Sequence, residues 1–327
     1  MAATKGDYSH ALLYAKLSLL EATLGGGVFS KNHQRLLVSS PHHLAVYRMR
    51  DPLPYSKIAT VIMAARSRVG SLYSVDEAMK VIQKGYTGPA SARQFCSRLV
   101  AQSYAEAGVD LVSRPDFCSP HDLTISPLLE VVENAVCPAS PEVLAIAASV
   151  DINKRNQRAT MRWMKAARRI ASRENFAINT QSDVLPFVLA HPQHDAEITA
   201  KVRGTTYLEA LEHDRTANPF RYDLAKFIAA STRGGSVDEE IFSSELAKEE
   251  PLIDTYSRNL AAYRGASDSG LMYVRDHVAL YQALLEMIKE RLGIILGALA
   301  ALGMSGTRHE RQALQMLRTV QAALSQA

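Results

Sequence analysis

The pattern of apolar residues changes near residues 134–141, and this change constrains the fold more than any other feature. Before it, short apolar runs at 10–14, 17–22, 27–30 and 43–49 are broken by Gly, Lys and Pro, which is typical of strands joined by hairpins. After the proline-containing segment Asn134–Pro141, apolar residues recur at helical spacing only. The sequence therefore predicts two domains, residues 1–135 with strands and residues 141–327 composed of helices.

Helical spacing also occurs inside the first domain. One run covers Tyr55–Val69 and stops at Gly70, and a second covers Cys96–Ala107 and stops at Gly108. These runs predict an α+β domain in which a small antiparallel sheet packs on helices, followed by an all-α domain. The helices expected in the second domain cover residues 142–150, 156–176, 194–215, 221–231, 237–265, 268–301 and 308–325.

Composition restricts the class of protein. With 47% hydrophobic and 21% charged residues, the 327-residue chain is neither disordered nor a coiled rod. A formal charge of +4 disfavours nucleic acid as a partner. The apolar stretch Leu292–Met304 is too short to span a bilayer and predicts a buried helix. Because the first residues also lack a secretory signal, we expect a cytoplasmic protein, with signal-independent export as the alternative.

The three cysteines are sparse and odd in number. Cys96, Cys118 and Cys137 suit free thiols in a reducing compartment, and no Cys/His spacing resembles a zinc site, so we expect no metal and no cofactor. Cys96 directly precedes the helical run. A thiol there meets unsatisfied backbone N–H groups and the positive end of the helix dipole, which favour the thiolate. The alternative is a small core residue at the edge of a helix.

A predicted hairpin would bring two further titratable residues, His10 and Glu21, together. If Ala15 and Lys16 form a two-residue turn between the first two strands, His10 lies directly opposite Glu21 on one face. The carboxylate could then fix the imidazole tautomer, as catalytic triads require. A one-residue shift would put the two side chains on opposite faces, leaving an exposed histidine and an unrelated carboxylate.

The order of these segments resembles the circularly permuted papain-like cysteine hydrolases of the NlpC type, the YiiX/YaeF-like amidases. The resemblance covers about the first 130 residues, and its strongest segment begins at Phe95-Cys96-Ser97 and runs to Gly108. The other segments that carry it are Tyr8 to Tyr14, Leu20-Glu21-Ala22, Gly27-Val28, Leu44 to Arg48, Ala64-Ala65, Gly70 to Ser74 and Cys118 to Leu123 with Ser126.

This resemblance implies a papain-like fold in which permutation puts the histidine ahead of the cysteine. By position, Cys96 is the nucleophile, His10 its base and Glu21 the orienting group. Tyr73 corresponds to a tyrosine near the family's cleft, and Tyr8 is a second candidate for binding substrate. The implied substrate is an amide in a peptide or cell-wall fragment. The alternative is a thioesterase or lipid acyltransferase that uses the same triad on an acyl ester or thioester.

Three further possibilities remain at this stage. The chain has nine residues ahead of His10 and lacks the Gly-Asp-Ile-like strand with which the family opens, so an inactive papain-like domain with a helical interaction module is the competing hypothesis. The segment 154–173 has eight basic residues and no acidic one, which allows contact with an anionic membrane surface, although a solvated helix face has the same pattern. The helical domain could also form a homo-oligomer.

Overall fold

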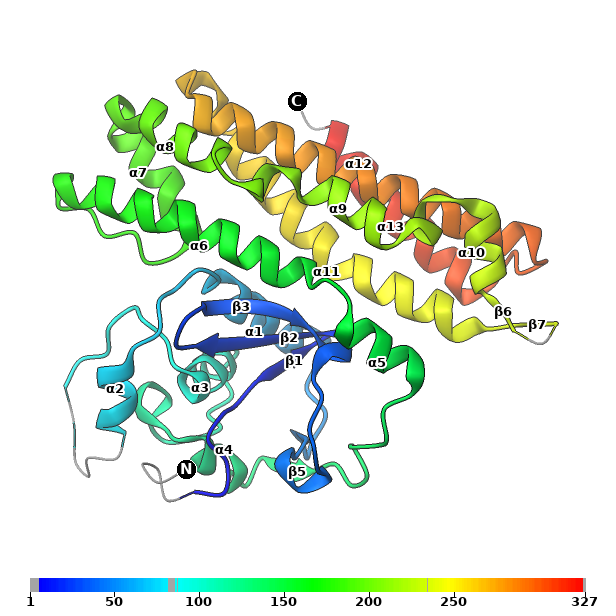
Figure 1. The fold of residues 1–327 in the computed structure, drawn as a ribbon, viewed down its shortest axis with the longest axis horizontal. Coiled ribbons are helices and arrows are strands. Elements are labelled where there is room, and N and C mark those ends of the chain that lie inside the picture. The colour runs from blue at the N-terminus through cyan, green and yellow to red at the C-terminus, as the bar shows by residue number, and fades with distance from the viewer. Residues whose placement is uncertain (1–5, 82–85, 87, 234, 326–327) are drawn as a thin grey trace. The chain divides into compact units, whose positions relative to one another are not determined.

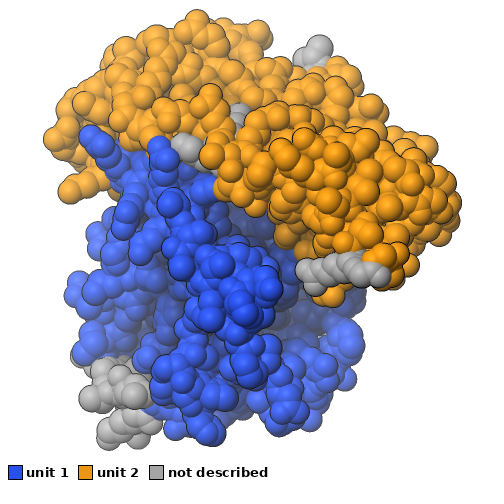
Figure 2. Space-filling model, turned by 45° about the vertical axis from the view of Figure 1, so that its right-hand side comes forward, with its two compact units in different colours: residues 1–164, 177–183 blue, residues 165–176, 184–327 orange. Residues whose placement is uncertain are grey.

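The computed structural model describes residues 6–81, 86, 88–233 and 235–325 (Figure 1). Contacts divide the chain into two compact units, which Figure 2 distinguishes by colour. The first unit is Met1–Met164 with Ala177–Asp183, and the second, helical unit is Lys165–Phe176 with Val184–Ala327. The division therefore lies inside helix α6 (Ile152–Ala171), further along the chain than the predicted edge at residues 135–141.

Helix α5 (Pro141–Ala148) explains this difference in the boundary. It was assigned from the sequence to the helical domain, but it belongs to the first unit. The Arg35 guanidinium donates to the carbonyls of Ala147, Ser149 and Val150 at the end of α5, at 3.4, 2.9 and 3.0 Å. Helix α5 therefore packs on the first unit although it follows the proline-containing connection. The local sequence does not reveal this packing.

The first unit has an α+β fold built on a three-stranded antiparallel sheet. Its strands β1 (Leu13–Ala15), β2 (Ser18–Thr23) and β3 (Gly27–Asn32) are adjacent in the order of the chain (Figure 1). A second, two-stranded sheet pairs β4 (Tyr47–Met49) with β5 (Leu129–Val131). The helices are α1 (Tyr55–Ser67), α2 (Val75–Lys80), α3 (Cys96–Glu106), α4 (Pro120–Thr124), α5 and the first part of α6.

The register of the first hairpin differs from the predicted one by two residues. Leu13 pairs with Leu20 and Ala15 with Ser18, so the turn is Lys16-Leu17 and not Ala15-Lys16. Both turn residues have positive φ, 44° and 64°, as a type I′ turn requires. Hydrogen bonds support this unusual sequence, because Ser18 Oγ donates to the Ala15 carbonyl at 2.7 Å and the His33 ring to the Leu17 carbonyl at 2.7 Å.

The core of the first unit lies between the sheet and α3. Leu20 and Val28 from the sheet and Leu99 from α3 are fully buried in one cluster, with Ala65 of α1 beside them. Because β2 alternates, the residues between these apolar ones point to the other face. The sheet therefore fixes both the position of α3 and the direction of the polar side chains of β2.

The second unit is helical except for a two-stranded hairpin, β6 (Thr232–Arg233) and β7 (Ser236–Val237), which the sequence did not predict. Its long helices α11 (Glu239–Arg264), α12 (Met272–Ala301) and α13 (Arg308–Ser325) agree with the expected ranges. The predicted helix at 194–215 is two helices, α8 (Asp195–Arg203) and α9 (Ala210–Ala217). The unit also contains α7 (Val184–Ala190) and α10 (Leu224–Ala230).

Across the described residues, every helix falls short of the length and apolar character that crossing a membrane demands. The stretch Leu292–Met304 lies largely within α12, where Leu292 and Ile295 are buried in the helical unit.

Candidate active site

Helix α3 begins at Cys96, as the sequence predicts. Phe95 precedes it in extended conformation and provides no side-chain cap, so the first N–H groups of the helix remain available. The Cys96 sulfur accepts hydrogen bonds from the backbone N–H groups of Ser97 and Ala11. Cys96 is 5% exposed, so the thiol is largely shielded from water while its polar contacts come from the protein.

His10 lies just ahead of β1 and reaches Glu21 on β2. Its Nε2 is 3.2 Å from Glu21 Oε2, and the two side chains are 36% and 19% exposed. The two-residue change of register preserves the face of each side chain, so His10 is the diagonal neighbour of Glu21 instead of its direct partner. The structure thus brings the predicted pair together, although the register that predicted it was wrong.

The His10 ring also hydrogen-bonds to Cys96, and the two contacts shift three pKa values. The bonds to Cys96 and Glu21 raise the pKa of His10 to about 9 against the opposing effect of burial. The bond to His10 lowers the pKa of the Glu21 carboxyl. Burial opposes ionisation of Cys96, but His10 and the backbone N–H groups outweigh it and lower the thiol pKa. The contacts therefore favour an imidazolium–thiolate pair with a carboxylate behind it.

Tyr73 also contacts the Cys96 thiol. Its hydroxyl hydrogen-bonds to Cys96, and its pKa is raised, first by burial and then by the neighbouring thiol. The segment before it is held against β3, because Val28 N–H donates to the Ser71 carbonyl at 2.9 Å. Gly27 permits this approach: its φ is +63°, and a Cβ there would lie 2.1 Å from the Ser71 oxygen.

Sequence reasoning missed a buried ion pair that anchors α3. Arg98 is fully buried, and its Nη1 lies 2.9 Å from Glu77 Oε2. Arg98 also donates to the carbonyls of Asp116 and Arg93 at 2.7 and 2.9 Å, while Ser97 Oγ donates to the Cys118 carbonyl at 2.6 Å. The local sequence contains no signal for this pair, because Gln102 lies one turn further along α3 and makes that side of the helix look polar.

The remaining candidates lie elsewhere. Tyr8 is near Tyr47 and contributes, after burial, to the raised pKa of that residue, so its role as a substrate contact stays a prediction. Burial raises the pKa of Cys118 to about 12, whereas Cys137 is exposed. Across the residues that the structure describes, no three His, Cys, Asp or Glu side chains form a group that could hold a metal ion.

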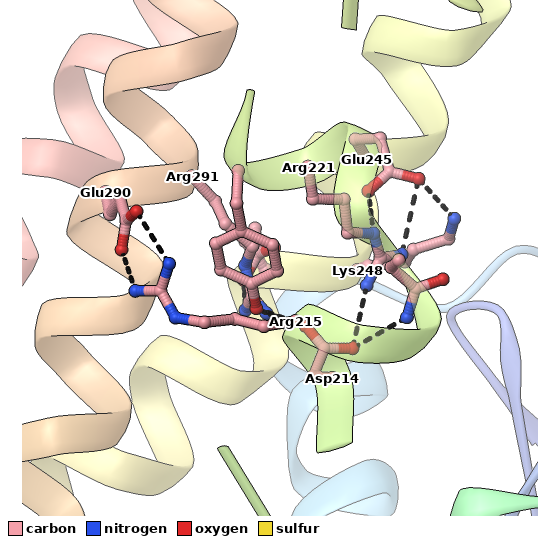
Figure 3. Close-up of polar contacts among 10 residues, drawn as sticks. Asp214, Arg215, Arg221, Glu245, Lys248, Glu290 and Arg291 are labelled. Carbon is pink, nitrogen blue, oxygen red and sulfur yellow. Dashed lines mark hydrogen bonds and ion pairs between the residues drawn. The ribbon is translucent and has the colours of Figure 1, made fainter. Parts of the chain in front are cut away.

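The helical unit contains a second cluster of charged side chains, which Figure 3 shows. Arg291 is 4% exposed, and its Nη2 lies 2.6 Å from Glu249 Oε2 while its Nη1 lies 2.8 Å from Asp214 Oδ2. Arg221 Nε lies 2.7 Å from Glu245 Oε2. The group joins α9, α11 and α12 through paired charges of opposite sign.

The structure thus places an imidazole between a carboxylate and a thiol at a helix start, with the histidine ahead of the cysteine in the chain, which is the order that the resemblance to permuted papain-like hydrolases implies. Residues 5–118 match the model of a family described as permuted papain-like amidase enzymes, YaeF/YiiX, C92 family. This match confirms the resemblance over the N-terminal part of the chain. Neither the curated proteins nor the solved structures that were searched include a significant match.

Proposed function

We propose that the first unit is a cysteine hydrolase that cleaves an amide bond through a thioester on Cys96. The observation that carries the proposal is the continuous set of contacts from Glu21 through His10 to the Cys96 sulfur. Because Nε2 of His10 is engaged by Glu21, Nδ1 is the ring nitrogen left for the sulfur. The lowered thiol pKa favours the thiolate, which is the nucleophilic form.

The reaction proceeds in two acyl-transfer steps. The Cys96 thiolate attacks the carbonyl carbon, and the imidazolium of His10 gives its proton to the leaving amine as the C–N bond breaks. Water then attacks the thioester while His10 accepts its proton, and the thiolate leaves as the acid product forms. Glu21 keeps the imidazole oriented in both steps.

Tyr73 and the start of α3 serve the oxyanion in this proposal. Negative charge moves from the sulfur to the carbonyl oxygen during attack. Hydrogen-bond donors near the sulfur are therefore suited to stabilise both the thiolate and the oxyanion. The Tyr73 hydroxyl and the Ser97 N–H already bond to Cys96 in the free protein. Both are therefore assigned to stabilising the transition state, with Cys96, His10 and Glu21 as the triad.

The family description, amidase, supports an amide substrate. The proposal takes this amide to lie in a peptide or cell-wall fragment, as the resemblance implies. The same thioester chemistry would serve an acyl ester or thioester. A hydrolysis panel of an aminoacyl anilide, an acyl nitrophenyl ester and an acyl thioester separates these classes. In each case Cys96→Ala abolishes turnover if Cys96 is the nucleophile.

Alkylation with iodoacetamide, followed site by site by mass spectrometry, tests the nucleophile directly. We expect Cys96 to react below pH 7 and to be alkylated faster there than the exposed Cys137. Loss of the imidazolium in His10→Ala should slow Cys96 by on the order of 10–100-fold at that pH. Cys137 in the same sample is the internal control.

Two outcomes would count against the enzyme. If Cys96 follows the pH dependence of Cys137, or if His10→Ala leaves its rate unchanged, the thiol is not activated and the inactive-module hypothesis is favoured. If activation is present but Cys96→Ala retains turnover of every substrate class, the thiol is not the nucleophile of that reaction.

A further inference from the structure

Helix α5 is apolar in sequence yet buries none of its side chains. Its eight residues, Pro141–Ala148, contain one charged residue, Glu142. Leu144, Ala145 and Ala148 share one exposed face, and Leu144 is 51% exposed. Val150, just beyond the helix, is 78% exposed. An apolar helix that leaves this face in water is suited to contact another apolar medium.

This exposed surface is held in place by the rest of the first unit. The guanidinium of Arg35 donates to the Ser149 hydroxyl at 2.7 Å, in addition to the three carbonyls at the end of α5. Four hydrogen bonds from one side chain thus fix the chain between α5 and α6. The orientation that exposes Leu144 and Val150 is therefore built into the fold.

A set of cations follows immediately. Lys154, Arg158 and Arg162 recur every four residues on α6, with Arg155 beside them, and all four are exposed. The opposite side of the helix is core, where Trp163 is 1% exposed. No acidic residue occurs in Ile152–Ala171. Later in the basic segment Arg173 pairs with Glu197 at 2.9 Å. The four early cations belong to the first unit, as α5 does.

We propose that α5 and the first half of α6 form a docking surface for an anionic lipid bilayer. Leu144 and Val150 enter the headgroup boundary, and Lys154, Arg155, Arg158 and Arg162 bind lipid phosphates. The apolar part favours a bilayer over a nucleic acid, because a phosphate backbone would leave Leu144 and Val150 in water. This surface is separate from Cys96 in its residues, and the proposal does not depend on catalysis.

Co-sedimentation of the full chain with vesicles tests the proposal. We expect binding to phosphatidylcholine vesicles that contain phosphatidylglycerol, weakened by salt, and little binding to phosphatidylcholine alone. Each cation near such a surface contributes roughly fivefold to the affinity for vesicles. The triple variant Arg155→Gln, Arg158→Gln, Arg162→Gln should therefore bind on the order of 100-fold more weakly. The matched control is Arg275→Gln, Arg308→Gln, Arg318→Gln, which removes the same charge from exposed positions of α12 and α13.

A second pair of variants tests the apolar part. Leu144→Ser with Val150→Ser should weaken binding to anionic vesicles, whereas Leu189→Ser with Leu314→Ser, at positions 43% and 37% exposed, should not. Circular dichroism establishes that each variant is folded. Absence of binding to anionic vesicles overturns the proposal. It is also overturned if duplex DNA competes fully and the Leu144/Val150 variant binds normally, because the surface would then be a polyanion site.

Discussion

The two units each contain a cluster of charged side chains, and the clusters are built in opposite ways. In the first unit an imidazole contacts both a thiol and Glu21, and the pKa of His10 rises to about 9 while that of Cys96 falls. In the helical unit Arg291 lies between Glu249 and Asp214, at 2.6 and 2.8 Å, and each charge has a partner of opposite sign (Figure 3). The first arrangement shifts the pKa values of its members. In the second, each charged side chain is balanced by a partner of opposite charge.

The two clusters also differ in how far their basic side chains are exposed. His10 is 36% exposed on its side chain, so a substrate can approach it, whereas Arg291 is 4% exposed. Burial raises the pKa of Glu249 even with Arg291 beside it. A buried pair of this kind contributes little net stability, but the loss of one partner leaves an uncompensated charge. We therefore expect substitutions in the helical cluster to change stability and those at the thiol to change reactivity.

The largest expected effect is that of Arg291→Met. Removing the guanidinium leaves the buried Glu249 without its ion-pair partner and Asp214 with Arg221 alone, which should cost about 3–5 kcal/mol of the free energy of unfolding. Denaturant unfolding monitored by circular dichroism measures this loss. Adding Glu249→Leu to Arg291→Met should restore part of it, because an apolar pair often replaces a buried ion pair well.

Arg318→Met on the exposed face of α13 is the matched control and should change stability little. The alkylation rate of Cys96 should be the same in all three variants under folding conditions. A slower Cys96 in folded Arg291→Met would contradict the separation of the two clusters into structural and reactive ones.

Gly27→Ala should have the next largest effect, and it acts on the first unit through the backbone. The added Cβ would lie 2.1 Å from the Ser71 oxygen at a φ of +63°. Strain and overpacking together should lower the free energy of unfolding by about 2–4 kcal/mol. Gly25→Ala is the control, because no atom lies within 4 Å of a Cβ at that position. Equal stability of the two variants would show that β3 does not depend on this close approach.

Glu21→Gln should affect reactivity more than stability. Without the carboxylate, the pKa of His10 falls from about 9, so the imidazolium–thiolate pair is lost at a lower pH. The alkaline limb of the pH profile of Cys96 alkylation should therefore move to lower pH. Turnover should fall on the order of 10–100-fold because the imidazole is less well oriented.

Lys31→Gln is a useful comparison, because Lys31 Nζ is 3.9 Å from Glu21 Oε1, whereas His10 contacts the other carboxylate oxygen, Oε2. It should move the profile much less than Glu21→Gln. If Glu21→Gln left the alkaline limb where it is, Glu21 would not be the group that orients His10.

The thiol and its helix could be predicted because their signals are local. Cys96 directly precedes a helical run, and α3 spans Cys96–Glu106, close to the expected range. For the hairpin, the sequence predicted the face on which each side chain lies but not which residues pair. The turn at Lys16-Leu17 depends on hydrogen bonds from Ser18 and His33, and the latter is distant in sequence. Turn residues alone therefore gave the wrong register.

Features that depend on contacts between distant residues could not be predicted in the same way. Glu77 and Arg98 are 21 positions apart, and nothing in the local pattern of either indicates a buried ion pair. Arg35 hydrogen-bonds to the end of α5 across more than 110 residues of sequence, and that helix belongs to the first unit. In both cases one charged side chain satisfies backbone or carboxylate groups that only the folded chain brings within reach.

Tyr73→Phe should give the smallest effect, and it tests how the thiolate is stabilised. The variant removes one hydroxyl donor from the sulfur and keeps the ring, so the first unit should retain its stability within about 1 kcal/mol. The pKa of Cys96 should rise, because one hydrogen bond to the thiolate is lost, and the acid limb of the alkylation profile should move to higher pH. Turnover should fall roughly 3–10-fold, the equivalent of one hydrogen bond. Tyr104→Phe on the same helix as Cys96 is the control for loss of a half-buried hydroxyl. If the two variants behave alike, Tyr73 is a packing residue, and His10 with the backbone N–H groups of Ala11 and Ser97 is sufficient to hold the thiolate.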